Sequence, residues 1–368
     1  MMVLGAAAWT NAAVADPAKP DNLEIPINQT VMRNGALRYS VWVKVGDRSV
    51  EALLDTGSTG LRVLPAVVPG DLSGMPLDAG FATGETMKGL SISESVEIGP
   101  FSATMPVEVI DGMGCRPDHP ACGYAQGNTD YLIGGDGGTG HGFSAILGIG
   151  FTARDRDLPN PLELFGAAQW IVSLPRPDEL TPGRLILKPD ASLQAQYKTH
   201  PKYESGDVFG CLRSKGLEQD ICGTVNFDTG GPGVLAVTEG EAPATDWAAG
   251  TDVSLKLQGE PPLAFHVGDG GPASQVRVLP YKLRFTKEAP FINAGVYPYF
   301  FYDVLYDAAA HKVGINAREP LKPSALQSAD AADGLTADNS TVQTAPATPP
   351  KLRRPRRHPA ATRSIALQ

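Results

Sequence analysis

Two copies of one tripeptide carry the residues of this chain that could do acid–base chemistry. Asp-Thr-Gly occurs at 55–57 and again at 228–230. A single copy is also an ordinary turn sequence. Two copies 173 residues apart, each between apolar runs, indicate one design used twice. If the carboxyls of Asp55 and Asp228 are in contact, only one of them ionises easily. The pair would then share a proton, with one carboxyl acting as base and the other as acid.

Strands and tight turns must position these two carboxylates. The apolar residues before each aspartate predict a strand that ends there, and the Thr-Gly that follows predicts a turn into another strand. A carboxylate at a buried strand end requires hydrogen-bond donors, a second titratable group or both, because burying a lone charge is costly. The spacing of the tripeptides is about one small domain. We therefore predict two similar lobes with the aspartates at their interface.

Alternating and glycine-containing segments predict the surrounding elements. Residues 37–46 predict a strand paired with the one that carries Asp55. Residues 81–89 predict a turn and 90–98 a strand, giving a hairpin that could close over the carboxylates. The apolar run 143–151 should pack beneath Asp55. The glycine-rich segment 123–142 lacks Gly-Lys-Ser/Thr and is interpreted as a loop rather than a phosphate site. We also expect a helix at 160–165, strands at 170–174, 184–187, 253–257 and 276–279, and a closing segment at 290–316.

Composition favours a mostly β protein: 368 residues include 41 Gly and 32 Pro. The net charge of −9 gives no reason to expect a nucleic-acid partner. The four cysteines form two local pairs, Cys115–Cys122 and Cys211–Cys222, which we expect to be disulfides in an oxidising compartment. Metal binding is the alternative, but neither pair has C-x-x-C spacing. The six histidines are scattered, and we expect no metal and no cofactor.

The two ends of the chain differ from its body. Residues 1–15 combine a short apolar run with a small-x-small pattern and are interpreted as a signal peptide. They lack a basic leading segment, so a truncated signal peptide or a disordered stretch are the alternatives. No other run approaches the ~18 apolar residues of a membrane span. Residues 319–368 are predicted to be a disordered Pro/Ala-rich tail with a basic cluster. We expect a periplasmic or secreted monomer.

From residue 37 to residue 316 the sequence resembles the bilobal, pepsin-like aspartic endopeptidases, and most closely their bacterial members. The motifs are D-T-G-S-T-G-L-R-V at 55–63, A-I-L-G-I-G-F at 145–151, V-N-F-D-T-G-G at 225–231 and I-N-A-G-V at 292–296. The resemblance implies a mostly β fold of two β-barrel-like lobes, 16–190 and 191–318, with the active site between them. It also implies hydrolysis of peptide or protein substrates by a water activated between the two aspartates, with no covalent intermediate.

The resemblance also implies roles for the neighbours of the aspartates. Thr56 and Thr229 would bind across the lobe interface and keep the carboxylates coplanar. Gly57 and Gly230 would allow the tight turns and offer backbone N–H donors. Ser58 would donate its hydroxyl to the first carboxylate.

The flap over the cleft is one departure from the family pattern. Phe81, Thr83 and Gly84 are the predicted flap and substrate-binding residues, and Phe81 stands where the family carries a tyrosine. Without that hydroxyl we expect reduced turnover or altered specificity. Four residues could line or support the side-chain pockets: Arg62, Phe81, Met87 and Ile149.

The second motif departs as well. Gly231 stands where the family usually has Ser or Thr, so we expect Asp228 to lose one donor. The pH optimum would then be less acidic than that of pepsin, since a lost donor disfavours the ionised form. Asn293-Ala294-Gly295 fits the carboxy-terminal pattern only loosely, which weakens the expected support of Asp228.

A catalytically silent peptide-binding or inhibitor protein of the same fold is the alternative function. Two intact Asp-Thr-Gly motifs favour catalysis, because a silent protein has no need for two carboxylates at a costly site. The sequence contains neither a G-x-S-x-G nucleophile elbow nor an H-E-x-x-H zinc motif.

Overall fold

The computed structural model describes residues 23–70, 72–81, 84–117, 122, 124, 132–135, 140–150, 158–177, 179–203, 206–214, 219–238, 245–269, 275–280 and 290–319. Within these residues the chain is mostly β and forms two sheets, as predicted for the class. The predicted signal peptide and all of the predicted tail except Glu319 lie outside the described residues. None of the described helices is long and apolar enough to cross a membrane.

The larger sheet has thirteen strands in the order β11-β21-β20-β9-β10-β1-β2-β3-β8-β4-β7-β6-β5. Its strands are β1 (Leu23–Val31), β2 (Leu37–Val45), β3 (Arg48–Asp55), β4 (Thr59–Val63), β5 (Met75–Gly80), β6 (Glu85–Ile98), β7 (Phe101–Cys115), β8 (Ala145–Ile149), β9 (Gln169–Ser173), β10 (Gly183–Leu187), β11 (Lys198–Pro201), β20 (Tyr302–Asp307) and β21 (Lys312–Ala317). An additional pairing of β2 with β6 curls part of this sheet back on itself.

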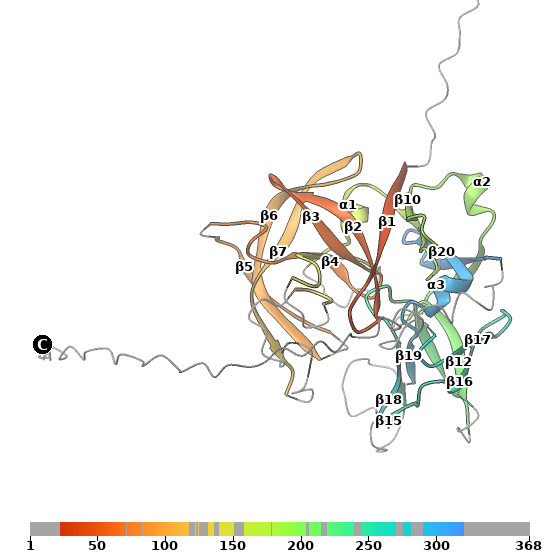
Figure 1. Cartoon of the computed structure of the whole chain (residues 1–368). Coiled ribbons are helices and arrows are strands. Elements are labelled where there is room, and N and C mark those ends of the chain that lie inside the picture. The colour runs from red at the N-terminus through yellow and green to blue at the C-terminus, as the bar shows by residue number, and fades with distance from the viewer. Residues whose placement is uncertain are drawn as a thin grey trace, which may run out of the picture. The chain divides into compact units, whose positions relative to one another are not determined.

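Strands from both ends of the described chain meet in the larger sheet. The first half of β1 pairs with β10, and its second half pairs with β2. On the other side of β10 lie β9, β20 and β21, so that only β10 and β9 separate the red first strand β1 from the blue strand β20 (Figure 1). The predicted lobe boundary at residue 190 falls between β10 and β11. The later strands β11, β20 and β21 nevertheless belong to the larger sheet.

The smaller sheet has eight strands in the order β15-β18-β14-β19-β13-β12-β16-β17. Its strands are β12 (Val208–Ser214), β13 (Ile221–Asn226), β14 (Val234–Thr238), β15 (Thr245–Asp246), β16 (Asp252–Leu257), β17 (Leu263–His266), β18 (Val276–Pro280) and β19 (Phe291–Asn293). Figure 1 shows them in green to blue, below the larger sheet.

One four-strand arrangement occurs in both sheets. In the larger sheet the order is β3-β8-β4-β7, and in the smaller sheet it is β13-β19-β14-β18. In each case the second strand, β8 or β19, is here called the central strand. It is parallel to the first strand and antiparallel to the third, and the third is parallel to the fourth. An Asp-Thr-Gly turn joins the first strand to the third in both. The internal repeat predicted from the sequence is therefore present at the level of strand pairing.

The predicted strands around the first aspartate are confirmed, with one error in the hairpin. β2 pairs with β3, and β8 lies parallel to β3. Residues 85–89, predicted as part of a turn, instead begin β6. Gly89 lies at a bulge in the pairing of β6 with β7 and not in a turn. The position requires glycine, because a Cβ there would lie 2.2 Å from the Val109 carbonyl oxygen. The strands predicted at 170–174, 184–187, 253–257 and 276–279 correspond to β9, β10, β16 and β18.

Three short helices occur among the described residues: α1 (Pro161–Leu164), α2 (Ala191–Gln194) and α3 (Tyr297–Phe301). The predicted helix at 160–165 is α1. Asn160 caps this helix: its side-chain oxygen accepts from the Leu162 backbone N–H at 2.8 Å, and proline occupies the first helical position.

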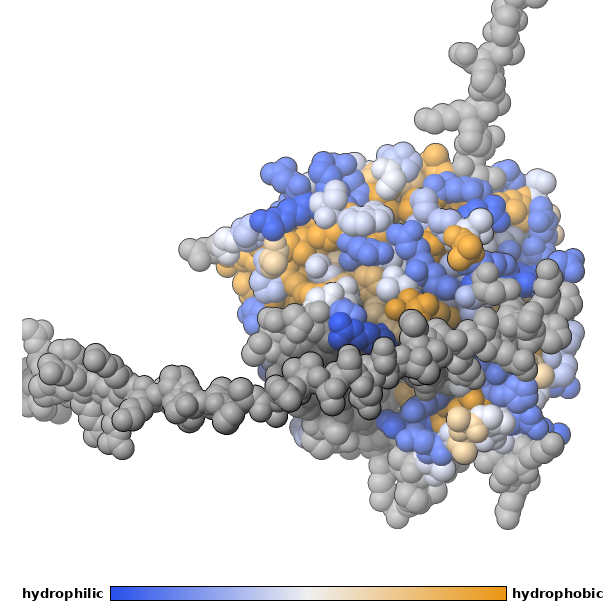
Figure 2. All heavy atoms as spheres, in the orientation of Figure 1, coloured by the Kyte–Doolittle hydropathy of each residue, from blue (hydrophilic) through white to orange (hydrophobic). Residues whose placement is uncertain are grey.

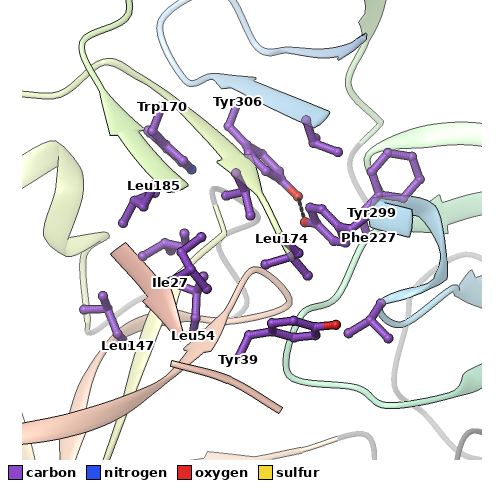
Figure 3. Close-up of a cluster of buried hydrophobic side chains, with 14 of the residues drawn as sticks. Ile27, Tyr39, Leu54, Leu147, Trp170, Leu174, Leu185, Phe227, Tyr299 and Tyr306 are labelled. Atoms are coloured by element: carbon purple, nitrogen blue, oxygen red, sulfur yellow. Dashed lines mark hydrogen bonds between the residues drawn. The ribbon is translucent and has the colours of Figure 1, made fainter. Parts of the chain in front are cut away.

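A continuous hydrophobic core supports the strands that carry the two motifs. Figure 3 shows buried side chains of the larger sheet packed together, among them Ile27, Leu54, Leu147, Trp170, Leu185 and Tyr306. Tyr299 lies beside Tyr306, and Phe227 lies beside Tyr299. On the surface, hydrophobic and hydrophilic residues are interspersed over the described face drawn in Figure 2. Both predicted disulfides, Cys115–Cys122 and Cys211–Cys222, are formed.

Candidate active site

Asp55 is the last residue of β3 and is only 5% exposed. The apolar residues before it are buried, and Gly148 of β8 lies opposite it in the parallel pairing. A side chain at 148 would collide with the backbone of Thr59, since a Cβ there would lie 2.7 Å from its carbonyl carbon. The glycine thus lets β8 pass close beneath the turn, as predicted for this segment.

Two donors hold the Asp55 carboxyl. The Gly57 backbone N–H donates to Oδ1 at 2.7 Å, and the Ser58 hydroxyl donates to Oδ2 at 2.5 Å. Both contacts are those predicted for the first motif. They stabilise a charge that burial would otherwise make costly.

Asp228 follows β13 and is half-buried. Its Oδ1 accepts from the Gly230 backbone N–H at 2.9 Å, and its Oδ2 accepts from Asn293 Nδ2 at 2.5 Å. The expectation that Gly231 leaves this carboxylate short of a donor is therefore wrong, because Asn293 reaches it from the neighbouring strand β19. In the sequence, Asn293 fits the family's carboxy-terminal pattern only loosely. The feature that could have indicated its role is a single amide side chain within the otherwise apolar run from Phe291 to Val296.

The two Asp-Thr-Gly turns hold each other. The backbone N–H of Thr56 donates to Thr229 Oγ1, and the backbone N–H of Thr229 donates to Thr56 Oγ1, both at 3.0 Å. The hydroxyls in turn donate to the backbone carbonyls of Phe227 and Leu54, at 2.7 and 2.6 Å. This reciprocal pairing, expected from the resemblance, joins the larger sheet to the smaller one directly beneath the carboxyls.

Each motif's glycine lies against the other motif's carboxyl. A Cβ on Gly57 would lie 2.5 Å from Asp228 Cγ, and a Cβ on Gly230 would lie 2.8 Å from Asp55 Cγ. Real Cβ atoms do not approach other heavy atoms so closely, so only glycine fits at either position. Arg38 of β2 adds a further link, donating from Nη1 to the Gly230 carbonyl oxygen at 2.5 Å.

Two buried tyrosines extend the hydrogen-bond network and were not predicted. Tyr299 lies 3.0 Å from Thr56 Oγ1, and its hydroxyl lies 2.5 Å from that of Tyr306 (Figure 3). Because the Thr56 hydroxyl proton is directed at Phe227, Tyr299 is the donor to Thr56. Burial raises the pKa of both tyrosines well above the ordinary value, so both keep their protons. No local sequence pattern connects them with Thr56.

The electrostatics of the site favour a shared proton. Burial, reinforced by the charge of Asp228, raises the pKa of Asp55 to about 8, and the Ser58 hydroxyl opposes the shift. Each carboxyl also lies against the glycine of the other motif, which brings the two acidic groups together. One of them therefore carries a proton over a wide pH range.

Both carboxyls line one cleft. Its described apolar lining includes Leu53, Phe81, Met87, Ile133, Ile146 and Leu235, and its polar lining includes Arg38, Glu85, Gln275, Arg277 and Asn293. Arg277 also binds Asp246 through two nitrogen–oxygen contacts of 2.6 and 2.9 Å.

The residues predicted to line or support the side-chain pockets fall into two groups. Phe81 and Met87 line the cleft, but Ile149 and Arg62 are fully buried and are not part of its described lining. Arg62 instead forms an ion pair with Glu108, with Nε 2.8 Å from Oε2, and its guanidinium carbon lies 5.8 Å from the centre of the Phe81 ring.

The predicted flap is the turn between β5 and β6. Phe81 and Gly84 close this turn, the Gly84 backbone N–H donating to the Phe81 carbonyl at 3.0 Å. Gly84 has a φ of +96°, which favours glycine, and is not among the described residues of the cleft lining. Thr83 lies outside the described residues.

Within the described residues, no group of three or more His, Cys, Asp or Glu side chains is arranged to hold a metal ion. Comparison with protein-family models and with curated proteins finds no match to this chain.

Proposed function

We propose that the protein is an aspartic endopeptidase of the bilobal, pepsin-like kind. The observation that carries the proposal is the meeting of Asp55 and Asp228: two carboxyls from turns 173 residues apart each lie against the glycine of the other motif and line one cleft. Two contacting carboxyls that share a proton supply one base and one acid at the same place.

The repeated strand arrangement supports the proposed architecture. Each carboxyl follows the first strand of an equivalent set of four, β3-β8-β4-β7 or β13-β19-β14-β18. The site lies where these sets meet through Thr56 and Thr229. Two similar lobes with a site between them are the expected product of such a repeat.

The proposed reaction is hydrolysis of a peptide bond by a water held between the carboxyls. The ionised carboxylate takes a proton from the water as its oxygen bonds to the scissile carbonyl carbon, and the protonated carboxyl gives its proton to the carbonyl oxygen. When the C–N bond breaks, the carboxyl that took the water's proton passes it to the leaving nitrogen. The other recovers a proton from a hydroxyl of the tetrahedral intermediate, so the pair returns to its starting state.

The pH range of the reaction should reflect the protonation of the pair. Since the pKa of Asp55 is raised to about 8, the site keeps one proton well above the acidic range. Activity requires one proton on the pair, so it should extend toward neutral pH, and the optimum should be less acidic than that of pepsin.

The cleft suits an extended peptide with apolar side chains. Phe81, Met87 and Ile146 line the same cleft as the carboxyls, and the turn that carries Phe81 belongs to the hairpin of β5 and β6. Main-chain hydrogen bonds to such hairpins and apolar pockets for side chains are a usual mode of peptide binding. The two disulfides support the proposed periplasmic or secreted location.

Cleavage of a denatured protein or a mixed peptide library between pH 3 and 8 tests the proposal. We expect cleavage that pepstatin inhibits and that both Asp55→Asn and Asp228→Asn abolish. Cleavage that survives in either variant would indicate a contaminating or different activity. If the folded chain cleaves nothing but binds peptides stoichiometrically, the silent peptide-binding function replaces the enzymatic one.

A further inference from the structure

The two motifs differ in the residue that follows the tripeptide. In the first motif this residue is Ser58, whose hydroxyl donates to Asp55 Oδ2 at 2.5 Å. In the second motif it is Gly231, which has no side chain. Asp228 Oδ2 therefore cannot accept a hydrogen bond from the side chain of the residue that follows its own tripeptide.

A second difference lies on the central strands β8 and β19. In the larger sheet Leu53, two residues before the aspartate, is paired with Ile146. In the smaller sheet Asn226, again two residues before the aspartate, is paired with Asn293. Ile146 and Asn293 thus occupy equivalent positions. The first motif has the Ser58 hydroxyl and no amide at this position of its central strand. The second motif has no hydroxyl at Gly231, but its central strand carries the Asn293 amide.

The Asn293 amide is fixed in orientation. Its side chain is 5% exposed, and its Oδ1 accepts from the Gly295 backbone N–H at 2.9 Å. Since that oxygen is already placed against an N–H, Nδ2 must face Asp228, where it donates to Oδ2 at 2.5 Å. An amide nitrogen donates and does not accept hydrogen bonds. A proton on Asp228 Oδ2 would therefore oppose this contact.

We propose that Asn293 is the positioning residue that replaces the missing hydroxyl of the second motif and keeps Asp228 ionised, directing the shared proton to Asp55. This assignment rests on the proposed endopeptidase function. It makes Asp228 the base toward the attacking water and Asp55 the acid toward the carbonyl. A serine hydroxyl, which can rotate and also accept, would impose this division less strictly.

Asn293→Leu removes the donor and keeps a side chain of similar size. A hydrogen bond to a charged acceptor contributes enough that its loss should move the acid limb of the kcat/KM profile upward by about one to two pH units. Asn316→Leu, the same change on β21, should leave the profile in place. If leucine prevents folding, as judged by circular dichroism, Asn293→Ala makes the same test.

Adding Gly231→Ser to Asn293→Leu distinguishes positioning from general structural support. A Cβ at 231 would lie 3.4 Å from Asp228 Oδ2, in ordinary contact, so a serine hydroxyl can reach the orphaned oxygen. We expect the second substitution to return the acid limb most of the way toward its original pH. A profile unmoved by Asn293→Leu, or a shift that Gly231→Ser does not reverse, would overturn the assignment.

Titration of the aspartate carboxyl ¹³C signals in the full chain separates this inference from the proposed function. The Asp228 signal is identified by its loss in Asp228→Asn. In Asn293→Leu we expect its titration midpoint to rise by about one to two pH units. The shift does not require cleavage, so a chain without peptidase activity that shows it would refute the proposed function alone. An unchanged midpoint in an active enzyme would refute the role of Asn293 alone.

Discussion

Thr56 and Thr229 bind each other reciprocally, yet their surroundings are unequal. Thr56 Oγ1 donates to the Phe227 carbonyl and accepts from the Thr229 backbone N–H and from the Tyr299 hydroxyl. Thr229 Oγ1 donates to the Leu54 carbonyl and accepts from the Thr56 backbone N–H. The first threonine therefore satisfies three buried groups and the second satisfies two.

Substituting valine for each threonine should reveal this inequality, because valine keeps the shape and removes the hydroxyl. Buried groups left without partners should lower the free energy of unfolding by about 2–4 kcal/mol in Thr56→Val and about 1–3 kcal/mol in Thr229→Val. Urea unfolding measures both values, with Thr56→Ser and Thr229→Ser as controls that keep the hydroxyl. Equal losses of unfolding free energy in the two valine variants would mean that the hydrogen bond between Tyr299 and Thr56 does not contribute to stability.

Stability should fall as the pH rises from about 4 to about 8. The pKa of Asp55 is raised from 3.8 to about 8 in the folded chain, so in this window the folded state holds a proton that the unfolded state has lost. The fall should approach about 1.4 kcal/mol per pH unit at most, the value for one proton. Unfolding measured across this range should show the slope, and Asp55→Asn should flatten it. The exposed Asp47→Asn is the matched control, and a wild-type curve as flat as that of Asp55→Asn would contradict the prediction.

The sequence predicted the local part of the site. The apolar run before Asp55, the turn at Thr56 and Gly57, and the hydroxyl of Ser58 are all contained in one short segment, and the structure has them as expected. The same holds for β8 beneath Asp55, because an apolar run with glycines suits a strand that passes close to another backbone.

The parts that sequence reasoning missed depend on contacts between distant segments. Asn293 reaches Asp228 only because β19 runs parallel to β13 in one particular register. Tyr299 reaches Thr56 only because α3 packs against the first motif across 243 residues of sequence. Gly89 was misread as part of a turn, since a glycine required at a strand bulge looks the same in sequence as one required at a turn.

Gly57→Ala should slow cleavage by more than its loss of stability explains. The added methyl of Gly57→Ala would overlap the Asp228 carboxyl, so that carboxyl must move out of place. Misplacement of a reacting group by about 1 Å can cost on the order of 100-fold in rate. We therefore expect a loss of this order in the cleavage rate of folded Gly57→Ala. Gly112→Ala, where the nearest atom to the new Cβ is 4.0 Å away, should keep its activity. A folded Gly57→Ala with full activity would show that the carboxyl has room to shift.

The ion pair between Arg62 and Glu108 should matter mainly through the cost of breaking it. Both side chains are fully buried, with Nε 2.8 Å from Oε2. Removing one partner leaves a buried charge unpaired, so Arg62→Met and Glu108→Met should each cost about 3–5 kcal/mol of unfolding free energy. The double variant should recover most of that loss, because two apolar side chains leave no charge behind. A double-mutant cycle in urea measures the coupling, and additive losses would show that the two charges do not depend on each other.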